Sequence, residues 1–320
     1  MTNPLVTILM AIYKPNIKWL VEQLESLNNQ TYSNLKLSVW NDAPDDETDY
    51  EEVYNNCITN FEYEIHVGKE NLGSNGAFEE LTKLATSEYV AYCDQDDVWL
   101  PEKIATLVGE AQASESDLLC SDMYVIDKDD NIVATSISKV RPRQIFYKGN
   151  DLFQYLFSRN FITGCTTLVK TEMAKNALPF PKEFVHDWWL GIFASAHGNV
   201  TSINKPLIKY RIHSNNQTGV LSGVYDKDSY YDKRIKEVIG RAIVLLDRFC
   251  GHRAYSEILI FHHYAECRMK YFKCASLVNF IELYKLRGLN KSTIYFELLL
   301  PFMPNFIFKF LIQQIRKGNI

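Results

Sequence analysis

Short apolar runs alternate with amphipathic segments along the first two hundred residues. The apolar runs, which predict strands, cover residues 5–13, 35–42, 63–68 and 88–94. The segments between them, which predict helices, cover residues 17–30, 46–58 and 75–86. Strands that are apolar almost throughout and are separated by helices indicate a parallel sheet covered on both faces. The fold class is therefore α/β, with a Rossmann-like, mostly parallel sheet.

The pattern changes towards the C-terminus. From residue 233 onwards the apolar period is helical and predicts two or three amphipathic helices, over residues 234–249, 255–286 and 292–317, the last broken near Pro301 and Pro304. Residues 216–232 have no clear period and predict a loop, either a lid that orders over a ligand or a plain linker. We therefore expect an α/β domain over residues 1–215. A helical region over 233–320 follows.

Three carboxylates stand where the fourth predicted strand ends, in "YCDQDDVW": Asp94, Asp96 and Asp97. Side chains two apart on a strand point the same way, so Asp94 and Asp96 should face the ligand edge together. Carboxylate oxygens grouped in this way suit Mg²⁺ or Mn²⁺ bridging to a diphosphate. The alternative is a polar turn that caps the next helix, with Pro101 in its first turn.

Polar residues also follow the other predicted strands, in "AIYKP", "VWNDAPDD" and "VGKENLGSNG". The carboxyl ends of parallel strands meet at one edge, where ligands bind in such sheets. "NLGSNG" lacks the lysine of a P-loop and the spacing of a dinucleotide fingerprint. Asn71 and Gly73 are therefore expected to shape the wall of a donor pocket.

Several motifs occur together in one order: "VTILMAIYKPN", "NLGSNGAF", "DQDDVWLPEKI", "NFITGCTTLVK", "FVHDWWLGIFASAHGNV" and "KPLIKYRIHSNNQTG". In this order they resemble the family 2 glycosyltransferases of the GT-A fold, and most closely the bacterial rhamnosyltransferase-like branch. The resemblance covers roughly residues 5–215. It implies that residues 1–215 form a catalytic domain, with a nucleotide-sugar half over about 1–100 and an acceptor half over about 101–215. It implies a metal-dependent, inverting transfer of a sugar, rhamnose or another hexose, from a UDP- or dTDP-sugar to a hydroxyl of a growing, lipid-linked cell-surface polysaccharide.

The resemblance implies a role for each matching donor-side residue. Nucleoside contacts fall on Ala11 and Tyr13, base recognition on Asp42, the ribose and metal on Asp94, the metal on Asp96 and His213, and the diphosphate on Arg211. The sequence departs from the family pattern after Asp42, where Ala43 and Pro44 replace the usual Gly and Ser.

On the acceptor side, the resemblance makes Asp187 in "HDWW" the catalytic base. Trp188, Trp189 and Gly164 are expected to contact the acceptor, although adjacent residues diverge by about 100° on a helix and at most one tryptophan should do so. Asp187 also fits an N-cap of the helix that follows it. The helix N-terminus would then lower its pKa, and catalysis would depend on geometry more than on basicity.

Three alternatives compete with a glycosyltransferase. "DQDDVW" fits the motif of haloacid-dehalogenase-type phosphatases, with Asp94 as nucleophile and Asp96 as acid, but those enzymes carry it on their first strand. A sugar nucleotidyltransferase would need a glycine-rich loop after the first strand. A non-catalytic subunit for polysaccharide assembly would not need Asp96, Asp187 and Arg211 together.

The charge is divided unevenly along the chain. Residues 1–232 hold 19 Lys and Arg against 33 Asp and Glu, whereas residues 233–320 hold 15 against 6. The basic residues of the tail alternate with apolar helices, which argues against a nucleic-acid partner. We expect the C-terminal helices to lie on an anionic membrane, or else to pack on the catalytic domain or form a homodimer interface.

Location is indicated by what the sequence lacks. The N-terminus has no basic region of a signal peptide, and no later run offers eighteen uninterrupted apolar residues. The 7 cysteines are odd in number and form no CxxC pair, as in reduced intracellular proteins. We therefore expect a cytoplasmic protein that is peripheral at the inner face of the membrane.

Overall fold

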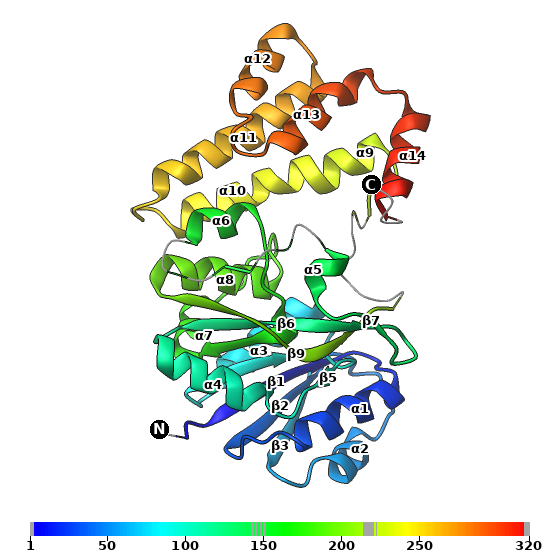
Figure 1. Cartoon of the computed structure of the whole chain (residues 1–320), viewed down its shortest axis with the longest axis vertical. Helices are drawn as coiled ribbons and strands as arrows, with labels where there is room; N and C mark the ends of the chain where they lie inside the picture. Colours follow the sequence, from blue (N-terminus) through cyan, green and yellow to red (C-terminus); the bar gives the residue numbers. More distant parts are fainter. Residues whose placement is uncertain are drawn as a thin grey trace. The chain divides into compact units, whose positions relative to one another are not determined.

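The computed structural model describes residues 3–141, 144, 146–147, 149, 152–213, 221 and 223–316. The chain forms two compact units, Met1–Ser214 and Asn215–Ile320. The first is an α/β unit and the second is helical throughout its described elements (Figure 1). The expected loop over 216–232 falls partly on residues 214–220 and 222, which lie outside the described residues.

A single sheet organises the α/β unit, in the strand order β3-β2-β1-β4-β8-β6-β9-β5, with β7 paired to β6. The strands are β1 (Val6–Ile12), β2 (Leu35–Asn41), β3 (Glu62–Val67), β4 (Tyr89–Cys93), β5 (Val98–Trp99), β6 (Leu118–Ile126), β7 (Ile132–Ala134), β8 (Thr167–Lys170) and β9 (Val200–Arg211). The first four are mutually parallel, and β8 runs antiparallel to both β4 and β6. The mostly parallel α/β sheet expected from the sequence is confirmed.

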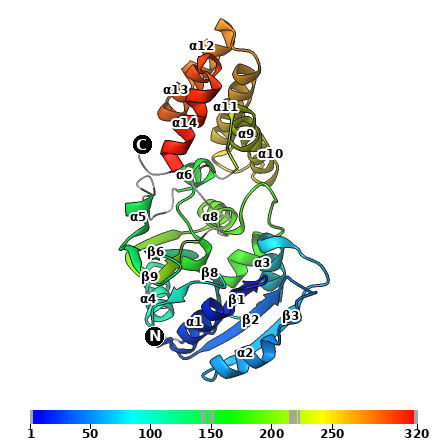
Figure 2. The same cartoon turned by 90° about the vertical axis from the view of Figure 1, so that its right-hand side faces the viewer.

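Helices cover both faces of the parallel half. The helices of this unit are α1 (Ile17–Asn28), α2 (Tyr50–Cys57), α3 (Gly73–Leu84), α4 (Lys103–Ser114), α5 (Ile137–Val140), α6 (Phe153–Ser158), η1 (Gly164–Thr166), α7 (Thr171–Asn176) and α8 (His186–His197). Figure 2 shows α1 and α2 on one face of β1–β3 and α3 on the other. In α1, the Asn16 side chain caps the first turn, and Leu20, Leu24 and Leu27 bury the face towards the sheet.

The helical unit contains more elements than the sequence predicted. They are α9 (Lys227–Tyr230), the π-helix η2 (Tyr231–Lys236), α10 (Glu237–Arg248), α11 (Tyr255–Lys273), α12 (Leu277–Lys285), α13 (Lys291–Leu299), η3 (Leu300–Phe302) and α14 (Asn305–Arg316). Because Asp226 and Ser229 form a capping box, the helix begins inside the expected loop over 216–232, and that boundary is corrected. Ser276 caps α12 separately, so residues 255–286 form two helices and not one.

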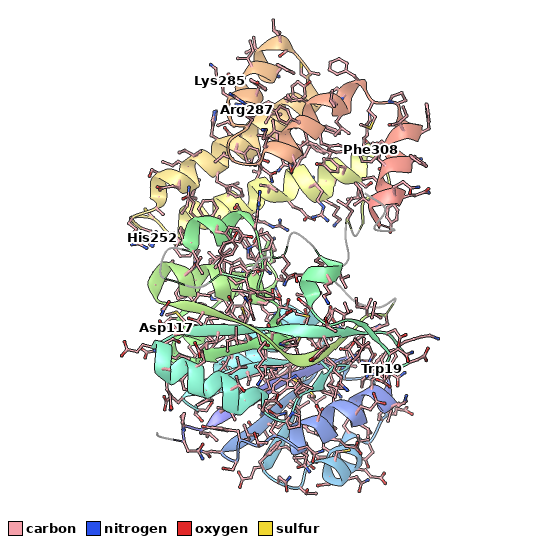
Figure 3. The ribbon with its side chains drawn as sticks, in the orientation of Figure 1. Trp19, Asp117, His252, Lys285, Arg287 and Phe308 are labelled. Atoms are coloured by element: carbon pink, nitrogen blue, oxygen red, sulfur yellow. The ribbon has the colours of Figure 1, made fainter. Side chains whose placement is uncertain are left out.

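The C-terminal helices pack within their own unit. Leu300, Phe308 and Ile312 are buried with Tyr230 and Ile235 in one apolar cluster, and Phe308 is marked on α14 in Figure 3. A buried ion pair between Arg268 and Glu297 joins α11 to α13. Removing residues 291–320 would therefore strip the core of this unit and leave a buried cation unpaired. Among the described helices, none combines the length and apolar character needed to cross a bilayer.

Candidate active site

Three neighbouring parallel strands, β2, β1 and β4, end at the same edge of the sheet. The segments that follow them carry Asp42, Tyr13 and Asp94 respectively. Gln95 ties two of these ends together, because its Oε1 accepts the Tyr13 backbone N–H at 2.7 Å and its Nε2 donates to the Tyr13 carbonyl at 3.3 Å. The structure thus brings the predicted nucleoside side and the carboxylates to one edge. Tyr13 itself is half exposed and Ala11 is half-buried.

The three carboxylates after β4 have different surroundings. Asp94 and Asp96 are half-buried, whereas Asp97 is fully buried and accepts the Arg211 backbone N–H at 2.9 Å. Asp96 Oδ2 lies 2.7 Å from His213 Nε2. Burial, with the charges of Asp96 and Asp187, raises the pKa of Asp94 to about 7. The carboxylates that a ligand can reach are therefore Asp94 and Asp96, whereas Asp97 accepts a hydrogen bond in the interior.

Arg211 does not occupy the place expected for a diphosphate ligand. Its side chain is fully buried, and its guanidinium contacts Glu22 Oε2 at 2.8 Å, Asp130 Oδ1 at 2.6 Å and the Asp96 carbonyl at 2.8 Å. Trp19 lies 5.1 Å from its guanidinium carbon. The expected direct contact with a diphosphate is corrected, because the buried cation is committed to protein groups. Arg211 instead fixes the backbone of the carboxylate segment.

Asp42 holds the glycine-containing loop. Its two carboxylate oxygens accept the backbone N–H groups of Leu72 and Gly73, each at 2.8 Å. Gly73 has φ +69°, a conformation that favours glycine, and Asn71 Oδ1 accepts its N–H as well. Asp42 is almost completely buried. Base recognition by Asp42 stays a prediction, as do the donor contacts of Asn71 and Gly73, and the observed function of the carboxylate is to shape the loop.

A buried polar layer lies beneath the carboxylates. Lys103 is fully buried, donates to the Cys165 carbonyl and lies 3.0 Å from the centre of the Trp99 ring. Burial lowers the pKa of Lys103 to about 7, and burial raises the pKa of the Cys165 thiol. Lys103 supplies positive charge near Asp94 and Asp97, which partly offsets the charge of these carboxylates.

Asp187 lies in the first turn of α8 and not at its N-cap, which is Val185. Its Oδ2 accepts the Gly164 N–H at 2.9 Å, and its Oδ1 accepts the Trp188 N–H. The expected lowering of its pKa is wrong. Burial raises the pKa of Asp187 to about 6, because desolvation of the carboxylate outweighs these two hydrogen bonds. Asp187 and Asp94 are close enough for their charges to interact.

The two tryptophans differ as their spacing predicts. Trp189 is fully buried and its Nε1 donates to the Ala177 carbonyl at 2.7 Å, so its expected contact with an acceptor is corrected. Trp188 is half-buried and its Nε1 donates to the Leu156 carbonyl. An acceptor contact of Trp188 stays a prediction. Gly164 contributes its N–H to Asp187, and a Cβ at this position would lie 2.7 Å from His186 Nε2. The glycine is therefore required by close packing.

The sequence interpretation missed three residues that organise the site. Gln95 and Lys103 both lie inside the motif "DQDDVWLPEKI", but no role was predicted for either residue. Asn75 joins α3 to the start of α8, because its Oδ1 accepts the His186 N–H at 2.8 Å and its Nδ2 donates to the Phe184 carbonyl. A contact across more than one hundred residues leaves no local sequence signal. Asn75 in this way links the helix that follows the glycine-rich loop to the start of α8, which carries Asp187.

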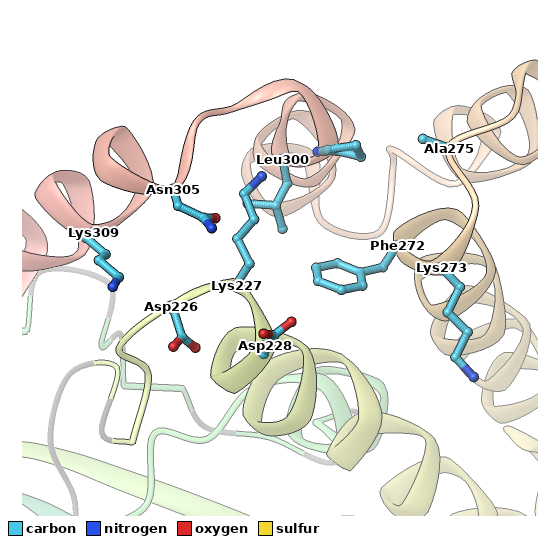
Figure 4. A pocket seen from close by; sticks show the side chains of 10 residues that line it. Asp226, Lys227, Asp228, Phe272, Lys273, Ala275, Leu300, Asn305 and Lys309 are labelled. Carbon is cyan, nitrogen blue, oxygen red and sulfur yellow. The ribbon is translucent and has the colours of Figure 1, made fainter.

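The helical unit holds a cavity of about 520 Å³. Figure 4 shows lysine and aspartate side chains from α9, α11 and α14 around it, with Phe272 on one wall. Lys227, Lys273 and Lys309 are interspersed with Asp226 and Asp228, and Asp226 is committed to the capping box. The cavity contains none of the motif residues, and we place no donor site there.

Of the groups near the strand ends, the buried cluster does not fit a divalent cation, whereas binding of a cation by Asp94, Asp96 and His213 stays a prediction. Asp94, Asp97 and Cys165 bring ligand atoms within 4.8 Å of one another. However, Asp97 and Cys165 are buried, and a protonated thiol is a poor ligand for Mg²⁺. Asp94, Asp96 and His213 offer two carboxylates and an imidazole, a set that suits Mn²⁺ and, through its oxygens, Mg²⁺. The pKa of Asp94, raised to about 7, marks the surplus negative charge that a cation would relieve.

Comparison with known proteins gives several relatives. An uncharacterised glycosyltransferase of Methanocaldococcus jannaschii is 27% identical over 218 residues, covering 66% of this chain and 72% of the relative. The Escherichia coli UDP-Glc:alpha-D-GlcNAc-diphosphoundecaprenol beta-1,3-glucosyltransferase WfgD is 26% identical, covering 66% of this chain and 79% of its own. The Shigella flexneri dTDP-rhamnosyl transferase RfbG is 25% identical, covering 63% and 71%. WfgD and RfbG are named for different sugars, so the relatives do not single out the rhamnosyltransferase-like branch.

Solved structures share the fold. S. aureus TarS 1-349 in complex with UDP-GlcNAc superimposes with a TM-score of 0.58 at 15% identity, covering 89% of this chain and 80% of that one. The mannosyltransferase PcManGT from Pyrobaculum calidifontis, in complex with GDP-Man and Mn²⁺, gives a TM-score of 0.50 at 16% identity, covering 90% and 74%. Both likenesses support a GT-A-like sheet followed by C-terminal helices.

The model of glycosyl transferase family 2 matches residues 7–177, just over half of the chain. The match contains β1–β4 and the carboxylates after β4, and Asp187 lies beyond it. It excludes the phosphatase and the non-catalytic alternatives. The protein therefore belongs to glycosyl transferase family 2 and is an inverting glycosyltransferase that uses a nucleotide-sugar donor.

Proposed function

We propose that the protein transfers a hexosyl group from a UDP- or dTDP-sugar to a hydroxyl of a lipid-linked saccharide during the synthesis of a cell-surface polysaccharide. The observation that carries the proposal is the position of Asp187, which is oriented by two backbone N–H groups beside Asp94 of the strand-end carboxylates. Inversion requires a base on the face of the sugar opposite the leaving nucleotide. In this proposal Asp187 acts on the side of the acceptor hydroxyl, and the carboxylate pair acts on the side of the leaving nucleotide.

In this mechanism Asp187 accepts the proton of the acceptor hydroxyl as the oxygen attacks the anomeric carbon. The raised pKa of Asp187, about 6, makes it a stronger base than an exposed aspartate while leaving it mostly ionised at neutral pH. The N–H groups of Gly164 and Trp188 fix the direction of the carboxylate. No protein nucleophile is needed.

Asp94, Asp96 and His213 would hold a divalent cation, Mg²⁺ or Mn²⁺, against the donor diphosphate. When bound there, it supplies positive charge to the departing nucleoside diphosphate. Arg211 keeps the segment in place through the Asp96 carbonyl and the buried Asp97. Arg211 is thus a positioning residue in this proposal.

The proposed donor sugar and acceptor are inferred from the activities for which two relatives are named. One acts on a diphosphoundecaprenol-linked GlcNAc with UDP-Glc, and another is a dTDP-rhamnosyl transferase. The name of the first includes a lipid-linked acceptor, and the name of the second gives a dTDP-sugar as donor. A glucosyl or a rhamnosyl donor would suit the chain equally. A cytoplasmic enzyme peripheral at the inner face of the membrane would meet such an acceptor.

The raised pKa of Asp187 predicts an acid limb in the rate of transfer. Below pH 6 the carboxylate is protonated, so kcat should fall about tenfold per pH unit, and above pH 7 it should be level as far as Asp187 is concerned. Initial rates at saturating donor and cation from pH 4.5 to 8 measure this. Nucleotide affinity measured at each pH distinguishes an effect of Asp94 protonation on donor binding from the effect of Asp187 protonation on kcat. A level kcat between pH 4.5 and 6 would contradict the role of Asp187.

A panel of nucleotide sugars tests the proposed donor. Purified protein is incubated with UDP-glucose, UDP-GlcNAc, dTDP-rhamnose and GDP-mannose, with Mn²⁺ or with EDTA, and release of the nucleoside diphosphate is measured. We expect release from a UDP- or dTDP-sugar that depends on the cation. Release from GDP-mannose alone would disprove the donor class.

A further inference from the structure

Apolar side chains recur on the outside of the last helices. Leu299, Phe302, Phe306 and Phe310, here called the outer stripe, are 63%, 74%, 74% and 57% exposed. Leu299 ends α13, Phe302 lies in η3, and Phe306 and Phe310 lie four residues apart on one face of α14. Within α14, Phe306 and Phe310 each lie two residues from the buried Phe308, which places them on the opposite side of the helix. The stripe is therefore a second apolar face that the core of this unit does not use.

The neighbouring helix α12 is exposed in the same manner. Leu277 and Val278 are 74% and 66% exposed, Ile281 is also exposed, and Leu283 is the buried residue of the helix. Ring contact between Tyr284 and Tyr295 connects α12 to α13, which leads into the outer stripe. Large apolar side chains gathered on consecutive helices mark an interaction surface.

Basic residues accompany this surface. Residues 268–317 contain nine Lys and Arg against two Asp and Glu. One acid, Glu297, is buried in the ion pair with Arg268, and Lys273 and Lys309 line the cavity beside Asp226 and Asp228. Between the end of α12 and the start of α13, Lys285, Arg287 and Lys291 stand against one acid, Glu282. Figure 3 marks Lys285 and Arg287 at the C-terminal end of α12. Exposed apolar side chains with surrounding Lys and Arg are typical of helices that lie in the interface of an anionic bilayer.

The charge also argues against self-association through this surface. In a two-fold dimer the same patch meets itself, so the basic residues of one copy would face those of the other. Like charges brought together oppose association. An anionic lipid surface satisfies both the charge and the apolar side chains.

We propose that the outer stripe and α12 form a membrane-docking surface, with Phe306 and Phe310 inserted among the headgroups and acyl chains of an anionic bilayer. The proposal adds a membrane-binding surface to the proposed function. It rests on that function in one respect, because the lipid-linked acceptor is the reason for binding the membrane. No bilayer crossing is implied, since the exposed side chains lie on one side of α14 while Phe308 and Ile312 stay in the core.

Co-sedimentation of the full-length protein with vesicles tests the surface. The variant Phe306→Ser/Phe310→Ser removes two exposed rings without touching the core. Its matched control, Leu259→Ser/Ile260→Ser, removes two apolar side chains that are similarly exposed on α11. We expect the native protein and the control to bind vesicles of phosphatidylglycerol and phosphatidylethanolamine at low salt. The stripe variant should bind them at least about 10-fold less, and vesicles of phosphatidylcholine alone should bind none of the three well.

Other outcomes would overturn the proposal. The proposal is wrong if the native protein fails to bind anionic vesicles at low salt, or if the stripe variant binds them as the native protein does. Sedimentation velocity without vesicles tests whether a second copy of the chain occupies this surface instead. A native dimer that dissociates in the stripe variant would show that it does. Hydrolysis of the nucleotide sugar without vesicles should be equal in all three proteins. Its absence in all three would contradict the proposed function and leave the vesicle result standing.

Discussion

Replacing Asp187 with asparagine is expected to lower kcat by about 10²- to 10⁴-fold, because an amide cannot accept the proton of the acceptor hydroxyl. Nucleoside diphosphate affinity should stay close to native, since the donor edge at Asp94 and Asp96 is unchanged. The substitution has a structural cost as well. Both oxygens of Asp187 accept backbone N–H groups, so an asparagine must turn its own NH₂ towards one of them. We expect a loss of stability of about 1 kcal/mol.

The measurement therefore combines single-turnover transfer, isothermal titration with the nucleoside diphosphate, and a thermal melt. Asp228→Asn is the matched control, because Asp228 also lies in the first turn of a helix but is exposed. It should retain full kcat. Turnover of Asp187→Asn within a few-fold of native would remove Asp187 from the role of base.

Replacing Asp96 with asparagine is expected to weaken binding of the donor and its cation. An amide oxygen keeps the hydrogen-bonding contact to His213 but loses the negative charge that attracts the cation. Changes in the outer shell of a metal site already cost about 10- to 100-fold in affinity, and loss of a ligand carboxylate should cost at least as much. EDTA should abolish transfer by the native protein.

Titration of Mn²⁺ in the presence of nucleoside diphosphate, for the native protein and for Asp96→Asn, measures this loss. Asp129→Asn removes an equal charge at an exposed position and should behave as the native protein does. Full activity in EDTA with an intact fold would show that the carboxylate pair acts without a cation.

The parallel half of the sheet could be predicted because its signals are local. Each of β1–β4 is a short apolar run bounded by turn residues, and each helix between them has an apolar face. The same local rule placed Asp94 and Asp96 at a strand end. In the helical unit, an apolar period ran through residues 255–286 and concealed the cap at Ser276. Periodicity does not record where one helix stops and another begins.

The errors in the site all concern burial, which the sequence does not reveal. Arg211 and Trp189 stand in motifs that match a glycosyltransferase, yet both side chains are fully buried. Burial also reversed the expected shift in the pKa of Asp187. Lysine is usually an exposed residue, yet the Lys103 side chain lies in the interior beside Trp99. Contacts between residues far apart in the chain decide each of these cases.

The ion pairs of Arg211 have a consequence for the order in which the molecule folds. Arg211 ends β9, and its guanidinium binds Glu22 of α1, 189 positions earlier in the chain. The backbone N–H of the same residue satisfies the buried Asp97. When only the first two hundred residues have been synthesised, β1–β4 are therefore present without the Arg211 guanidinium, which holds the carboxylate segment in place. Closing a loop of this length is slow relative to local helix formation, so the catalytic edge matures late and depends on synthesis of the last strand.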